Sequence, residues 1–144
     1  MNMPTNDNAS PIDATPYTLL GGETAVHQLV KRFYALMDTR PEAQGIRRLH
    51  PQDLTGSEEK LFMYLSGWLG GPQLFIEKHG HPMLRQRHFP FAISTNEASQ
   101  WMDCMRQALA ETTTNEALRT QLDISLTELA LHLRNRQDQA TPVP

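Results

Sequence analysis

The side chains most able to do chemistry gather in one short stretch of the chain. His79, His81 and His88 lie close together there, with the cations Arg85 and Arg87 between them. Imidazoles bind metals and transfer protons near neutral pH. Glycines and three prolines interrupt the stretch from 70 to 93, so any helix in it is confined to a few residues. A long loop of this kind inside a compact domain is usually functional.

Three interpretations of this histidine cluster are open. It could be a solvated basic loop without chemistry. A zinc site needs three or four ligands, and only Glu77 is near enough in sequence to complete the set. A haem pocket needs an imidazole on a short rigid element, large apolar side chains as a wall, and cations at the rim. His88, with Phe91 and Ile93 after it, offers the first two, and the adjacent Arg87 offers the third.

The elements that must position these residues are predicted to be helices. Apolar residues three and four positions apart predict a first helix that opens at Gly21-Gly22. A second is predicted from Thr55 to the break at Gly70-Gly71-Pro72, a third from Ser94 and a fourth from about Asn115. No stretch alternates apolar and polar residues as a strand would. The predicted fold class is therefore all-α.

Local signals refine two of these helices and the link between them. Thr55 with Glu58, and Ser94 with Glu97, have the spacing of a capping box at a helix start. Between the second and third helices we expect mostly loop, with one short helical turn that ends near His88.

Composition bounds the class of protein. The 144 residues fit one domain. Thirteen Lys and Arg against sixteen Asp and Glu give a net charge of −3, which disfavours nucleic acid as a partner. The longest apolar runs fall far short of the roughly 20 residues that span a bilayer, and no export signal is evident, so a soluble cytoplasmic protein is expected. The single cysteine, Cys104, lies on an apolar helical stripe and is predicted to pack in the core.

The ends of the chain differ in composition from its middle. Both are polar, contain prolines and show no apolar period. We therefore predict a flexible N-terminal extension over 1–16, a folded domain over 17–136 and a flexible C-terminal tail over 137–144.

A series of motifs in chain order resembles the group II truncated haemoglobins. The motifs are Arg32-Phe33-Tyr34-Ala35, His50-Pro51-Gln52-Asp53-Leu54, Glu58-Glu59-Lys60-Leu61, Gly70-Gly71-Pro72, Gly80-His81-Pro82-x-Leu84-Arg85-x-Arg87-His88-x-Pro90-Phe91 and Trp101-x-x-Cys104-Met105. The resemblance extends from about Tyr17 to Leu133. It implies a truncated globin, in which the first two predicted helices face the last two in a two-over-two sandwich around haem b.

The resemblance also implies roles for particular residues. His88 matches the proximal ligand of the haem iron, Tyr34 the distal tyrosine, and Trp101 the indole typical of group II. His50 matches a distal position and is a candidate sixth iron ligand, because the chain has a few extra residues before it. Lys60 and Arg87 match propionate partners. The residues predicted to bind haem are Phe33, Leu54, Ser57, Lys60, Leu61, Arg87, His88, Phe91, Ile93 and Trp101.

Hydrogen-bond donors over the distal face predict slow release of a bound diatomic ligand such as O₂, CO or NO. Tyr34, Trp101 and, in one tautomer, His50 are the candidate donors. Slow release favours redox chemistry of O₂, NO or peroxide, or ligand sensing, over bulk transport. NO-detoxifying or peroxidase-like activity, an unidentified reductase and the oligomeric state are left open. The competing hypothesis is a non-enzymatic helical interaction domain whose histidine loop is solvated or binds zinc weakly.

Overall fold

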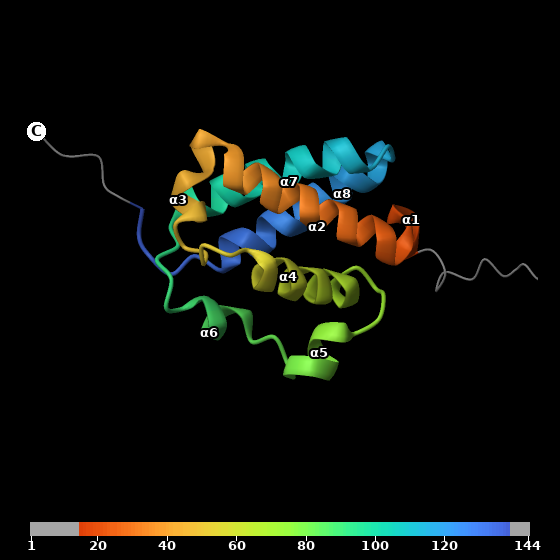
Figure 1. Cartoon of the computed structure of the whole chain (residues 1–144), viewed down its shortest axis with the longest axis horizontal. Coiled ribbons are helices and arrows are strands. Elements are labelled where there is room, and N and C mark those ends of the chain that lie inside the picture. The colour runs from red at the N-terminus through yellow and green to blue at the C-terminus, as the bar shows by residue number, and fades with distance from the viewer. Residues whose placement is uncertain (1–14, 139–144) are drawn as a thin grey trace, which may run out of the picture.

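A computed structural model describes residues 15–138 of the chain, and this part is all-α, as predicted (Figure 1). Its elements are α1 (Pro16–Leu20), α2 (Gly22–Thr39), the 3-10 turn η2 (Pro41–Ala43), α3 (Gln44–Arg47), α4 (Thr55–Trp68), α5 (Leu74–His79), α6 (Leu84–His88), α7 (Thr95–Thr112) and α8 (Glu116–His132). The predicted extensions lie outside the described residues over 1–14 and 139–144.

Four long helices form the sandwich. α2 packs against both α4 and α7, and α7 packs against α8. α2, orange in Figure 1, crosses close to α7 and above α4. Its buried face follows the predicted helical period, with Val26, Phe33 and Met37 fully enclosed. Burial of each such side chain contributes about 1.5–3 kcal/mol to folding, so this face fixes how α2 lies against its neighbours.

The predicted start of α7 is confirmed. Ser94 is the N-cap, its hydroxyl accepts a hydrogen bond from the Asn96 amide, and the Glu97 carboxylate accepts from the Ser94 amide at 2.7 Å. α8 begins as predicted after Asn115, whose side chain accepts from the Leu118 amide at 3.0 Å. These caps satisfy amides that the first helical turn leaves unpaired.

The predicted capping box at the start of α4 is wrong. Thr55 is the first residue of the helix and Leu54 is the N-cap. The Leu54 side chain makes no hydrogen bond to the first turn of the helix. The Asp53 carboxylate accepts from the Thr55 amide at 2.9 Å instead. An aspartate two residues before an amide forms this turn readily, and it leaves Thr55 with no capping role.

The segment between α4 and α7 holds two short helices rather than one. α6 ends at His88, as predicted, but residues Leu74–His79 form the additional helix α5. Gly80 ends α5 with a φ of +78°, a conformation that favours glycine. The Arg87 side chain then donates to the carbonyls of Pro82, His79 and His81. Arg87 therefore holds the turn between α5 and α6 in one shape.

Two further expectations concern membrane-spanning helices and the burial of the single cysteine. Within residues 15–138, no helix is both long and apolar enough to cross a bilayer. Cys104 is buried in the core, and burial raises the pKa of its thiol. It therefore packs as a small apolar side chain.

Candidate functional site

A cavity of about 530 Å³ lies within the sandwich, against α4, the α5–α6 segment, α7 and α8. Pockets that hold cofactors and small ligands span roughly 300–1,000 Å³ and are mostly apolar with a few polar groups. The lining residues are Tyr34, Ile46, Leu49, His50, Pro51, Ser57, Lys60, Leu61, Tyr64, Leu65, Phe75, Leu84, Arg87, His88, Phe91, Ile93, Glu97, Ala98, Trp101, Leu126, Leu129, Ala130 and Leu133.

Nearly all of the residues predicted from the sequence meet at this cavity. The exceptions are Phe33 and Leu54, which do not line it. Phe33 is fully buried behind the wall, with its ring centroid 4.8 Å from that of Tyr34 and 4.9 Å from that of Trp101. It therefore supports the two polar aromatics. Leu54 packs against the core at the start of α4.

His88 lines the cavity with one ring nitrogen already engaged. Its Nδ1 lies 2.7 Å from the carbonyl oxygen of Leu84, one helical turn earlier. A carbonyl can only accept, so Nδ1 carries the hydrogen. The neutral ring then has its lone pair on Nε2, the nitrogen that a metal would bind. The backbone of α6 thus sets both the orientation and the tautomer of this imidazole.

His50 is held in the same way on another part of the wall. Its Nδ1 donates to the carbonyl of Ile46 at 2.9 Å, and its ring lies edge-on to Tyr34 with centroids 5.7 Å apart. Burial lowers the pKa of His50, with smaller contributions from Arg47 and His88 in the same direction, although the hydrogen bond to Ile46 acts against them. The neutral ring presents an unprotonated Nε2.

Two hydrogen-bond donors in the cavity have no partner among residues 15–138. The Tyr34 hydroxyl is on a side chain only 5 % exposed, and neither it nor the indole N–H of Trp101 makes a hydrogen bond there. Burial raises the pKa of Tyr34, and the charge of Glu58 adds to this, so the phenol keeps its proton. A buried donor without a partner costs about 1–3 kcal/mol, and a ligand in the cavity would remove that cost.

Two cations reach the cavity. Lys60 makes no ion pair within the described part of the chain, so its ammonium is available to an anionic group. Arg87 is more committed, because its Nε and Nη2 donate to loop carbonyls and its guanidinium lies 5.2 Å from the Phe75 ring centroid. Only its Nη1 has no hydrogen bond among those residues.

Sequence reasoning missed part of the wall. α8 supplies Leu126 and Leu129, and Leu133 follows directly after its end; none of the three was assigned to the site. Tyr64 and Glu97 also line it. Tyr64 lies one turn beyond Leu61 on the predicted apolar face of α4, and that spacing was the available signal.

The other histidines of the cluster do not join the site. His79 and His81 are absent from the cavity wall, and the His79 ring lies against Phe75 instead. Across residues 15–138 no three or more His, Cys, Asp or Glu side chains are grouped to hold a metal ion. The zinc interpretation therefore gains no support.

Comparisons with known proteins agree with this geometry. Residues 15–135 match the family described as Bacterial-like globin. The group 2 truncated hemoglobin YjbI of Bacillus subtilis is 37% identical over 123 residues, covering 85% of this chain and 90% of that protein.

Solved structures are similar as well. The group II 2-on-2 hemoglobin of Agrobacterium tumefaciens has 48% identity and a TM-score of 0.84, covering 87% of this chain and 96% of that one. The cold-adapted truncated hemoglobin of Pseudoalteromonas haloplanktis has 45% identity and a TM-score of 0.83, covering 85% and 98%.

A helical sandwich around an apolar cavity, with an imidazole fixed at the cavity wall, defines a globin. The chain belongs to the bacterial-like globin family and is a group II truncated haemoglobin, as its motifs predicted. Membership implies a haem cofactor and diatomic ligands such as O₂. The residues present fit haem, because the cavity is mostly apolar and holds a fixed imidazole and two donors without a hydrogen bond to any of residues 15–138.

Proposed function

We propose that this chain binds haem b through Nε2 of His88 and holds a diatomic ligand under Tyr34 and Trp101 with slow release. The observation that carries the proposal is a pair of donors, unpartnered within the described part of the chain, that line the same cavity as the fixed His88 ring. When bound, haem supplies reversible coordination of a diatomic ligand and one-electron redox chemistry. The roles of this chain's residues then follow from their chemistry.

Tyr34 and Trp101 act as donors toward the ligand. Each is a neutral donor that cannot also serve as a proton sink, because the phenol keeps its proton and indole is donor only. His50 contributes differently from the sequence-based expectation. With its Nδ1 hydrogen on the Ile46 carbonyl, the neutral ring offers an acceptor rather than a third donor.

The remaining residues of the cavity wall bind the haem propionates or exclude water. Lys60 is the cation best placed to pair with a haem propionate, with Nη1 of Arg87 as the second candidate. Leu61, Phe91 and Ile93 line the cavity as apolar contacts that keep water from the haem. Ser57 is the small residue on the distal side. Tight retention by two donors supports redox chemistry of O₂, NO or peroxide, or ligand sensing, over bulk transport.

The optical spectrum of the purified protein tests the proposal. We expect a Soret band as isolated, which shifts on reduction with dithionite and shifts again on addition of CO. Apoprotein titrated with hemin should saturate at one equivalent. A protein that remains colourless after incubation with hemin would refute haem binding and return the histidine segment to a non-catalytic role.

The ferric spectrum tests whether His50 coordinates the iron. Its neutral Nε2 lone pair can serve as a ligand if the ring moves to the iron, so we expect a low-spin ferric spectrum typical of two histidine ligands. His50→Ala should convert it to a high-spin spectrum. His81→Ala is the matched control, because His81 is exposed and outside the cavity wall. A high-spin wild-type spectrum that is unchanged in His50→Ala would show that His50 stays off the iron.

A further inference from the structure

The short helix that carries His88 has little support from the other helices. α6 packs closely against none of them, and it consists of five residues, Leu84–His88. Helices this short are not stable alone. The Arg87 side chain donates to two loop carbonyls and to the carbonyl of His79 in α5, and its guanidinium lies over the Phe75 ring of the same helix. Arg87 therefore ties α6 to α5, which packs against α4, and a second attachment comes from another part of the chain.

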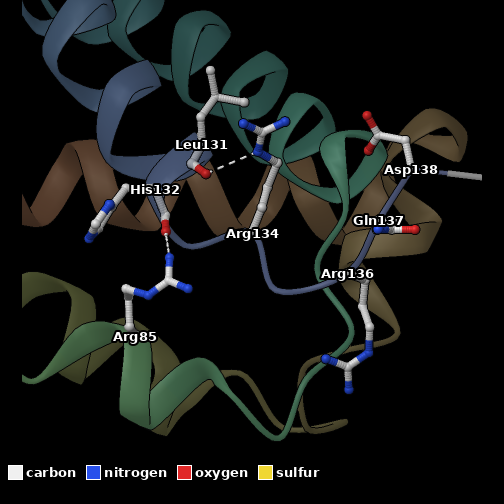
Figure 2. A pocket seen from close by; sticks show the side chains of 7 residues that line it. All are labelled: Arg85, Leu131, His132, Arg134, Arg136, Gln137 and Asp138. Carbon is white, nitrogen blue, oxygen red and sulfur yellow. Dashed lines mark hydrogen bonds between the residues drawn. The ribbon is translucent and has the colours of Figure 1, made fainter.

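That part is the segment that follows α8. Residues 133–138 continue from the end of α8 and pass beside the connection between α6 and α7, where the blue end of the chain meets the green in Figure 1. The Asn135 and Arg136 amides both donate to the Ile93 carbonyl, at 2.9 and 3.1 Å. On α6 itself, the Arg85 guanidinium donates to the His132 carbonyl at the end of α8 (Figure 2).

The Asn135 side chain makes the most specific contact of this segment. Its Nδ2 donates to the carbonyl oxygen of His88 at 3.1 Å, and its Oδ1 accepts from the Ile93 amide at 3.0 Å. The amide orientation is the one that pairs each donor with an acceptor. One side chain thus spans the connection 89–92 and ties together two residues of the cavity wall.

A second anchor lies further along the segment and does not touch α6. The Asp138 carboxylate accepts from the amide and the hydroxyl of Thr95, both at 2.9 Å, at the start of α7. Arg134 donates to the same hydroxyl at 2.9 Å. In Figure 2, Asp138 and Arg85 lie on opposite sides of the open space beneath the end of α8. Asn135 bonds to His88 and Ile93, whereas Asp138 bonds to Thr95, so a substitution can remove either anchor by itself.

We propose that Asn135 is a positioning residue for His88, and that residues 133–138 act as a clasp that holds the proximal imidazole to the sandwich. The proposal rests on His88 as the haem ligand. Because His88 is the last residue of α6, its carbonyl fixes the end of the helix whose Leu84 carbonyl orients the ring. The His88 carbonyl also accepts from the Phe91 amide at 3.0 Å. Loss of the Asn135 bond therefore leaves the helix end held by its own turn alone, and the His88 ring is then oriented less firmly.

The test compares holoprotein variants that differ in which anchor is lost. Asn135→Asp keeps an acceptor for the Ile93 amide but sets a carboxylate oxygen against the His88 carbonyl. Asn135→Ala removes both of these bonds and the one that Oδ1 accepts from Nη1 of Arg136. Asp138→Ala removes two hydrogen bonds from the same segment without touching His88. We expect the iron–histidine stretching band of the ferrous protein to shift in both Asn135 variants and to stay in place in Asp138→Ala.

Haem loss to excess apomyoglobin gives a second readout. Loss of one hydrogen bond near the iron ligand should increase the rate of haem loss about five- to tenfold in the Asn135 variants. The rate in Asp138→Ala should stay close to that of the wild type. Far-ultraviolet circular dichroism verifies folding, and the nearly isosteric Asn135→Asp guards against a variant that fails to fold.

If the iron–histidine band did not move in either Asn135 variant, or moved equally in Asp138→Ala, the clasp would be wrong, while His88 would remain the assigned ligand. Absence of the band from wild-type holoprotein, with the spectrum of His88→Gly unchanged, would overturn the assignment of His88 and the clasp with it.

Discussion

His88→Gly is expected to leave a folded protein that has lost nearly all of its haem. The side chain lies at the cavity wall, outside the buried core, at the end of a five-residue helix, so its removal costs the sandwich little. The chain then has no other imidazole held by α6 toward the cavity. The space left by the ring admits free imidazole, so millimolar imidazole should restore haem binding. The Soret absorbance per protein, with and without imidazole, measures both effects.

His79→Gly is the matched control. His79 is likewise the last residue of a short helix in the same segment, but it lies outside the cavity wall. We expect it to keep full haem content. If His88→Gly retained its haem with an unchanged ferrous–CO spectrum, His88 would not be the ligand, and His50 would become the first alternative to test.

Tyr34→Phe and Trp101→Leu each remove a donor from the distal wall, and each is expected to speed oxygen release. Tyr34→Phe is the cleaner change, because it keeps the ring that packs against Phe33 and removes only the hydroxyl. A hydrogen bond to a partly charged acceptor in a dry site is worth about 1–3 kcal/mol, which corresponds to an increase in the off-rate of roughly five- to 150-fold. Stopped-flow displacement of O₂ by CO measures that rate.

The indole can be tested with its ring retained as well. Trp101→Phe removes the N–H but keeps an aromatic side chain beside Phe33, and it should behave as Trp101→Leu does if the N–H is the working group. Tyr17→Phe and Trp68→Phe are matched controls outside the cavity wall, where no change is expected. Off-rates unaltered in both Tyr34→Phe and Trp101→Phe would mean that these donors do not meet the ligand.

The clasp assigns a role at the site to the polar C-terminal segment, which is to hold the helix that carries His88. The sequence predicts a flexible tail from 137 onward, because the region has no apolar period. The described part of that tail includes Asp138, whose carboxylate is held by Thr95 at the start of α7. Hydrogen bonds of this kind leave no periodic trace, since any polar residue at the right place in space can form them.

Much of the fold was predictable because it depends on local patterns. The helical period of α2, the capping box of Ser94 and the start of α8 near Asn115 each depend on signals within a few residues, and the structure agrees with all three. α5 was not predicted, since Leu74–His79 is too short for a period to emerge. α4 begins at Thr55 as predicted, but the capping box predicted there was wrong, because the Asp53 carboxylate accepts from the Thr55 amide.

By itself, the sequence determined the helical class, the family resemblance and the residue types of the site, because apolar period and motif spacing are properties of neighbouring positions. Only the tertiary structure decided which of those residues meet. It placed Phe33 behind the cavity wall, and it left the Tyr34 hydroxyl without a hydrogen bond to any of residues 15–138. It also joined Asn135 to His88, 47 positions earlier in the chain. Such contacts depend on how helices pack, and packing is set by the whole chain rather than by any local segment.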